Sequence, residues 1–194
     1  MPKTETETVE EKELSAHAEP ERKYGVAELP PDYDANPRIE IRQGYICIGK
    51  GQKVRVRESF TEDGTVVYTQ TTNNGDRGKD KHSPEVEIPK EMFEAMWPAT
   101  KGRRTYKTRY LVPIGDLTAE LDEYHRDLEG NYSVEVEFPS LLAYDLFEKP
   151  DWFGAEVTHD RRYSNSQLSK HGWPEEAPAE EDDDSIDQEP ALAA

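Results

Sequence analysis

The residues of this sequence most able to do chemistry are charged side chains that alternate with other residues along short stretches. The acidic sets are Glu19 with Glu21, Glu120 with Asp122 and Glu135 with Glu137, and the basic sets are Lys53 with Arg55 and Arg57, and Lys107 with Arg109. Residues two apart lie on one face of a β-strand. Each stretch is therefore expected to present charges of one sign on one side.

Two interpretations of these charged faces stay open on pattern alone. One is an ordinary antiparallel sheet with a solvated face. The other is a barrel closed by about eight strands with the charged faces inward. Because unpaired buried charge is costly, such an interior must hold water and ions. Arginine and lysine would bind phosphate oxygens, and the carboxylates would bind Mg²⁺ or Mn²⁺.

The elements that must position these residues are mostly strands. Alternating hydrophobicity and turn signals predict eight of them, at 19–26, 38–48, 53–57, 65–71, 85–88, 105–112, 118–124 and 132–138. Three short helices are expected from Lys90 to Trp97, from Ser140 to Glu148 and near Asn165. Pro89 opens the first of these helices and Pro98 stops it.

The acidity of the chain is concentrated at its ends. The formal net charge is −18, of which residues 1–18 carry −3 and residues 173–194 carry −9, leaving −6 for residues 19–172. We therefore expect one domain at 19–172 between two disordered acidic tails. The overall acidity argues against nucleic acid as a partner.

Cysteine content and hydropathy limit what can be expected about disulfides, membrane insertion and cellular location. A single cysteine, Cys47, excludes an intramolecular disulfide and is expected to be a small core residue. The sequence has no apolar run long enough to span a membrane and no signal peptide, so we expect a cytoplasmic protein without a membrane partner. The oligomeric state stays open between monomer and homodimer.

Short motifs follow one another in order through the domain. They are Glu-x-Glu-x-Lys at 19–23, Arg-Gln-Gly-Tyr at 42–45, Arg-Val-Arg at 55–57, Lys-Thr-Arg at 107–109, Glu-Leu-Asp at 120–122, Glu-Val-Glu at 135–137 and two aromatic-rich segments at 152–158 and 160–165. From about Glu19 to Gly172 this series resembles the CYTH family, also called triphosphate tunnel metalloenzymes. Within the family it most resembles the bacterial inorganic triphosphatases.

The resemblance implies a mainly β fold, a closed eight-stranded antiparallel β-barrel tunnel with a few short packing helices. It also implies hydrolysis of inorganic triphosphate, or of another short phosphate chain, with Mg²⁺ or Mn²⁺ as cofactor. By their match to the motifs, the metal ligands would be Glu19, Glu21, Glu120, Asp122, Glu135 and Glu137, and the phosphate-binding residues Lys23, Arg55, Arg57 and Arg109. Lys107 and Tyr45 match a catalytic pair near the attacked end of the substrate.

One side of the expected tunnel departs from the family pattern. Thr71 stands where the family has a lysine, and Lys81 and Ser83 stand where it has an arginine and a glutamate. Lys81 is kept as a candidate phosphate-binding residue. Two alternatives therefore stay open: a hydrolase of an organic triphosphate, such as a nucleoside or thiamine triphosphate, and a module that binds polyphosphate or a phosphorylated ligand without turnover.

Overall fold

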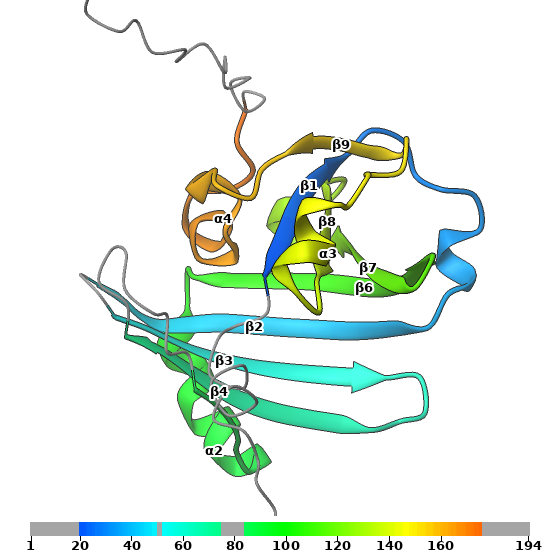
Figure 1. Ribbon diagram of the computed structural model, residues 1–194. Coiled ribbons are helices and arrows are strands. Elements are labelled where there is room, and N and C mark those ends of the chain that lie inside the picture. Colours follow the sequence, from blue (N-terminus) through cyan, green and yellow to red (C-terminus); the bar gives the residue numbers. More distant parts are fainter. Residues whose placement is uncertain (1–19, 50–51, 75–83, 176–194) are drawn as a thin grey trace, which may run out of the picture.

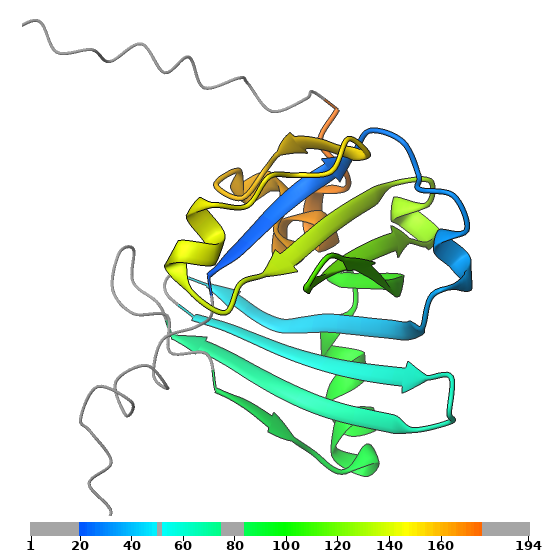
Figure 2. The same ribbon diagram turned by 45° about the vertical axis from the view of Figure 1, so that its right-hand side comes forward.

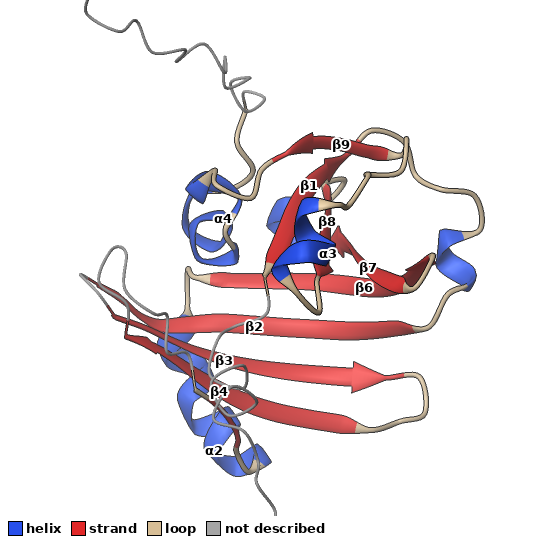
Figure 3. Cartoon of the chain, viewed as in Figure 1, coloured by secondary structure: helices blue, strands red, loops and turns tan. Residues whose placement is uncertain are grey.

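The computed structural model describes residues 20–49, 52–74 and 84–175, which form nine strands in one antiparallel sheet (Figure 3). The strands are β1 (Glu21–Val26), β2 (Arg38–Gly49), β3 (Gln52–Thr61), β4 (Val66–Asn74), β5 (Glu85–Glu87), β6 (Arg104–Ile114), β7 (Leu117–Tyr124), β8 (Tyr132–Glu137) and β9 (Phe153–Glu156). Their order across the sheet is β5-β4-β3-β2-β6-β7-β8-β1-β9. Two predicted site residues, Glu19 and Lys81, lie outside the described residues, as does Ser83.

All eight expected strands are present, and a ninth was missed. β9 contains only Phe-Gly-Ala-Glu, too short for a pattern of alternation to predict it. It pairs with β1, where Gly154 lies so close to Gly25 that an added Cβ would meet the Gly25 backbone at 3.1 Å. β1 itself begins immediately after Pro20, because proline is tolerated at the start of a strand.

The expected closure into a barrel is not found among the described strands, which form an open sheet. β5 pairs with β4 alone and β9 with β1 alone, so each is an edge strand. The sheet bends strongly between these edges: β2, β3 and β4 lie in the lower half of Figure 1 and β1, β8 and β9 in the upper half, and Figure 2 shows both edges. β5 and β9 have three and four residues, too few for a long ladder between the two edges.

Apolar side chains gather on the outer, convex side of the bend. Tyr24, Leu121, Val134, Val136 and Phe138 are buried in one cluster, against which α3 (Leu141–Asp145) contributes Ala143 and Tyr144. Alternation along each strand places the charged neighbours of these residues on the inner side. The hydrophobic core therefore lies outside the bend, and the concave face is left for polar groups.

Helices complete the convex side and one end of the sheet. α2 (Lys90–Met96) continues into η2 (Trp97–Thr100), and Phe93 stacks on Trp97 with ring centroids 5.2 Å apart. The short helices η1 (Tyr33–Ala35), η3 (Arg126–Leu128) and η4 (Arg161–Tyr163) lie in connections, and α4 (Asn165–His171) lies beside the ends of β2 and β6. All three predicted helices are confirmed, the second shorter than expected. No helix in the described part of the chain is long and apolar enough to cross a bilayer.

Cys47 is a correction to the sequence analysis, because its side chain is exposed rather than part of the core. A register shift between Tyr45 and Cys47 interrupts the pairing of β2 with β3. Such a bulge re-aims the side chains that follow it, which local alternation does not reveal.

Gly44 generates a prediction about how β2 is held. An added Cβ would lie 2.5 Å from the Cβ of Thr100, which is fully buried. We expect Gly44→Ala to lower the free energy of unfolding by about 1–3 kcal/mol, because a well-packed site must shift to accept the methyl group. Urea unfolding measures this change.

Gly25→Ala is the matched control, since it also lies in a strand but its added Cβ would meet nothing closer than 3.9 Å. We expect it to change the unfolding free energy by less than about 1 kcal/mol. Equal losses for the two variants would contradict the close approach of η2 to β2.

Candidate active site

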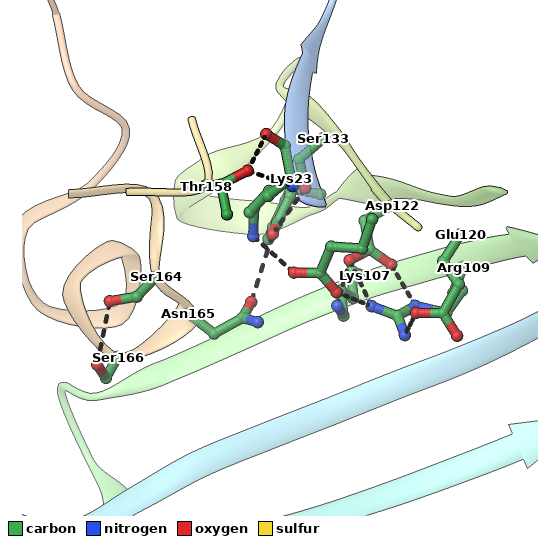
Figure 4. Close-up of polar contacts among 12 residues, drawn as sticks. Lys23, Lys107, Arg109, Glu120, Asp122, Ser133, Thr158, Ser164, Asn165 and Ser166 are labelled. Carbon is green, nitrogen blue, oxygen red and sulfur yellow. Dashed lines mark hydrogen bonds and ion pairs between the residues drawn. The ribbon is translucent and has the colours of Figure 1, made fainter. Parts of the chain in front are cut away.

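The sheet register brings most of the predicted site residues onto the concave face. Arg109 lies opposite Asp122, Glu120 opposite Glu135, and Glu135 opposite Lys23. On the other half of the bend, Arg57 and Arg55 lie opposite Gln43 and Tyr45. The side chains from β1, β6 and β7 that Figure 4 labels point toward one another. Strand alternation, recognised in the sequence, thus places the basic and acidic sets on one surface.

Arg109 is the centre of this surface. Its Nε donates to Asp122 Oδ1 at 2.7 Å, and its Nη2 donates to Asp122 Oδ2 and to Glu135 Oε2, each at 2.8 Å. A further bond joins its Nη1 to Glu120 (Figure 4). One guanidinium therefore connects carboxylates from β7 and β8, which fixes these side chains relative to one another.

The most deeply buried charges in this part of the chain are Lys107 and Asp122, which are 1% and 0% exposed and bonded to each other. Burial alone raises the pKa of Asp122, but the charges of Arg109 and Lys107 outweigh it and hold this pKa below its usual value. Burial, with the nearby charge of Arg109, lowers the pKa of Lys107 to about 8. Asp122 thus stays ionised between two cations.

Lys23 joins β1 to the same network. Its Nζ donates to Glu135 Oε1 at 2.9 Å, and its backbone N donates to Thr158 Oγ1 at 3.0 Å. Burial raises the pKa of Glu135, but the charges of Lys23 and Arg109 outweigh this effect and hold it well below its usual value. Burial raises the pKa of Glu120 against the opposing charge of Arg109. Within this cluster, Glu120 is therefore easier to protonate than Glu135.

On the opposite half, Thr71 occupies the position of the expected lysine and has taken up other contacts. Its hydroxyl accepts from Arg55 Nη2 at 2.8 Å and donates to Glu85 Oε2 at 2.6 Å. Arg55 also forms an ion pair with Glu85 at 2.9 Å. Thr71, Arg55 and Glu85 thus form a closed triangle across β3, β4 and β5.

Tyr45 and Lys107, expected as a pair, are not opposite each other in the register of β2 and β6. Lys107 lies opposite Ile41 of β2, and the Cα of Tyr45 is four residues, or about 13 Å, from that of Ile41 along the strand. Tyr45 lies instead beside Arg55 and Arg57: burial raises its pKa, and these two charges oppose the rise. The register of β2 against β6, which motif order alone does not contain, decides this separation.

The carboxylates differ in their fit to a metal ion. Glu21 and Glu137 lie directly opposite each other on β1 and β8, and both are exposed. Asp122 is fully buried, and both of its oxygens are bonded to cations. The described residues contain no preformed group of three or more metal-binding side chains. Glu21, Glu137 and the neighbouring Glu120 and Glu135 offer the oxygen ligands that Mg²⁺ and Mn²⁺ prefer.

Sequence reasoning missed several uncharged residues of this face, namely Gln43, Thr69, Thr105 and Ser133. Each is placed there by the register with Arg57, Gln43 or Asp122. The signal was present for Thr105, which lies two residues before Lys107 and so shares its face. Neutral side chains on a charged face do not stand out in the sequence.

Asp122 generates a stability prediction. Asp122→Ala removes the shared partner of Lys107 and Arg109 and leaves two buried cations with too little negative charge. We expect a loss of about 3–5 kcal/mol in the free energy of unfolding. Urea unfolding at neutral pH is the measurement.

Glu62→Ala is the control, because Glu62 pairs with Arg38 at 3.6 Å on the surface, where both side chains are about half exposed. We expect it to change the unfolding free energy by less than about 1 kcal/mol. A loss for Asp122→Ala no larger than the control would refute the proposed burial of the pair.

Comparison with known proteins supplies the family. The chain is 40% identical over 152 residues to an inorganic triphosphatase of Nitrosomonas europaea, a match covering 77% of this chain and 95% of that protein. It is 37% identical over 136 residues to an inorganic triphosphatase of Acetivibrio thermocellus, covering 70% of this chain and 83% of that protein. No family model matches the chain.

A solved structure agrees with these relatives. The crystal structure of the inorganic triphosphatase NE1496 matches with a TM-score of 0.59 and 37% identity, covering 78% of this chain and 94% of that one. The matches span nearly the whole length of the Nitrosomonas protein and the solved structure. This chain therefore belongs to the CYTH family, among its inorganic triphosphatases.

Proposed function

We propose that this protein hydrolyses a phosphoanhydride bond of inorganic triphosphate on the concave face, with Mg²⁺ or Mn²⁺ as cofactor. The observation that carries the proposal is the presence of an acidic and a basic surface on one face of one sheet. Glu120, Glu135 and Glu137 lie on one half and Arg55 and Arg57 on the other. The negative oxygens of a phosphate chain match the arginines, and a metal ion bound to the chain matches the carboxylates.

Arg57 is the strongest candidate for a phosphate-binding residue. Among the described residues no ion pair joins it to a carboxylate, and its Nε donates to a neutral group, Gln43 Oε1, at 3.2 Å. Burial, with the like charges of Arg55 and Arg109, lowers its pKa to about 10. An anion bound here would relieve that repulsion and form charge-assisted hydrogen bonds.

Glu21, Glu120, Glu135 and Glu137 are proposed to hold the metal, together with Glu19, which lies outside the described residues. When bound, the metal neutralises phosphate oxygens and lowers the pKa of an attacking water. Asp122 has a different proposed role, because its side chain is completely buried between Lys107 and Arg109, whereas that of Glu135, whose oxygens also contact cations, is 19% exposed. Asp122 holds Lys107 and Arg109 in position, and they in turn bind the phosphate.

The reaction itself needs mainly positioning and charge neutralisation. Water attacks a terminal phosphorus while the bridging P–O bond breaks, giving phosphate and diphosphate. In the proposed arrangement Lys107 and Arg109 bind oxygens near the attacked phosphorus, and Tyr45 orients the chain beside Arg55 and Arg57. We also propose that the sheet closes into the tunnel expected from the sequence when substrate binds. A phosphate chain bound at once by Lys23 of β1 and Arg57 of β3 would draw the two halves of the sheet together.

The test is phosphate release from inorganic triphosphate and from ATP, side by side, with Mg²⁺ and with Mn²⁺. We expect faster release from triphosphate, abolished by a chelator and restored by either metal. Glu137→Gln should weaken the apparent metal affinity about tenfold or more, since it removes a charged contact. Glu94→Gln is the control, because Glu94 lies on α2 of the convex side, where it pairs with Arg42.

The same assay separates the alternatives. Faster release from ATP than from triphosphate would favour an organic triphosphate as substrate. If neither substrate releases phosphate while triphosphate still raises the melting temperature, the protein is a binding module and the proposed function is wrong.

A further inference from the structure

Four side chains form a row on the concave face, at right angles to the strands, that crosses the basic half and ends on β6. Thr69 of β4 lies opposite Arg57 of β3, Arg57 opposite Gln43 of β2, and Gln43 opposite Thr105 of β6. We refer to these four residues as the polar row. With neighbouring strands about 4.8 Å apart, the row is roughly 14 Å long. Only one of its four members is charged.

The polar row concentrates polar atoms that lack partners. Among the described residues, the buried side-chain atoms without a hydrogen-bond partner include Thr69 Oγ1, Gln43 Nε2 and Thr105 Oγ1. The Gln43 and Thr105 side chains are 0% and 1% exposed. A buried polar atom without a partner is destabilising and rare in folded proteins. Three of them in register, on the face that carries the charged site, point to a ligand.

Gln43 shows which kind of ligand this is. Its Oε1 accepts from Arg57 Nε at 3.2 Å, so its Nε2 is left with two hydrogens to donate. The adjacent arginine, for which no ion pair is found in the described part of the chain, is also a donor. A row made of an amide NH₂, a guanidinium and two hydroxyls can donate to several oxygens of one anion.

We propose that the polar row is a phosphate subsite, in which Gln43 Nε2 and the hydroxyls of Thr69 and Thr105 donate to non-bridging oxygens of the phosphate chain held by Arg57. This inference rests on the proposed function and adds three binding residues to it. Neutral donors suit this position, because the charges of Arg55 and Arg109 already oppose the charge of Arg57. They add hydrogen bonds to the anion without adding positive charge to the empty site.

Thr105 gives the sharpest test, because binding and stability should change in opposite directions. Thr105→Val keeps the volume and removes an unpartnered buried hydroxyl, so we expect the melting temperature without ligand to rise by about 2–4 °C. The same change should raise the KM for inorganic triphosphate about tenfold. Thr105→Ser keeps the hydroxyl and should leave KM within about twofold of wild type.

Gln43→Leu tests the central donor. We expect it to raise the KM for triphosphate about ten- to a hundredfold, and to reduce the rise in melting temperature that triphosphate causes in metal-free buffer. The matched control is Gln70→Leu on β4. Gln70 lies next to Thr69 but faces the convex side, opposite Val56, and its amide donates to Thr72 at 3.5 Å. This control should leave both measurements unchanged.

The outcomes separate this inference from the proposed function. If wild type neither hydrolyses triphosphate nor is stabilised by it, the proposed function fails and the subsite fails with it. If wild type does both, but Gln43→Leu and Thr105→Val bind triphosphate as wild type does, the subsite alone is refuted. A fall in melting temperature for Thr105→Val would also refute it, because the hydroxyl would then be structural.

Discussion

The ion pairs around Arg109 are the interaction on which the rest of the site depends. Charged groups buried from water must be compensated, and Arg109 bonds to Asp122, Glu120 and Glu135 at once. Because β6, β7 and β8 are neighbours in the sheet, these carboxylates are brought to it by register rather than by sequence proximity. The network holds the acidic half of the concave face in one arrangement before any ligand binds.

The buried charges and hydrogen-bond donors on the two halves of the bend do not have partners to the same extent. On the half formed by β6, β7, β8 and β1, each buried cation has a carboxylate within hydrogen-bonding distance, as Lys23 and Lys107 show. On the half formed by β2, β3 and β4, Arg57 donates to an amide, and several buried donors have no partner among the described residues. A ligand with negative charge and many acceptor oxygens would supply what this half lacks.

The polar concave face is possible because folding is driven from the other side. Tyr24, Leu121, Val134 and Val136 are almost completely buried on the convex side, together with the aromatic residues beneath α3. Burial of this apolar area supplies the stability that a charged surface does not. Thr71, which stands where the family has a lysine, fits this division between a concave site and a convex core. It lies on the concave face, and its contacts with Arg55 and Glu85 change the site and leave the core untouched.

Which residues share a face can be read from the sequence alone, because alternation along a strand is local and has a period of two. The sequence placed eight strands and put Glu120 and Asp122 on one face of their strand and the apolar Leu121 on the other. It also contains the motifs by which the family was recognised. Three features follow from the tertiary structure alone: the described strands form an open sheet, β9 pairs with β1, and Lys107 lies opposite Ile41 rather than Tyr45. The tertiary structure also decided that Cys47 is exposed after a bulge and that neutral Gln43 and Thr105 lie within the charged site. These features depend on strand order, register and bending, which arise from contacts between residues far apart in the chain.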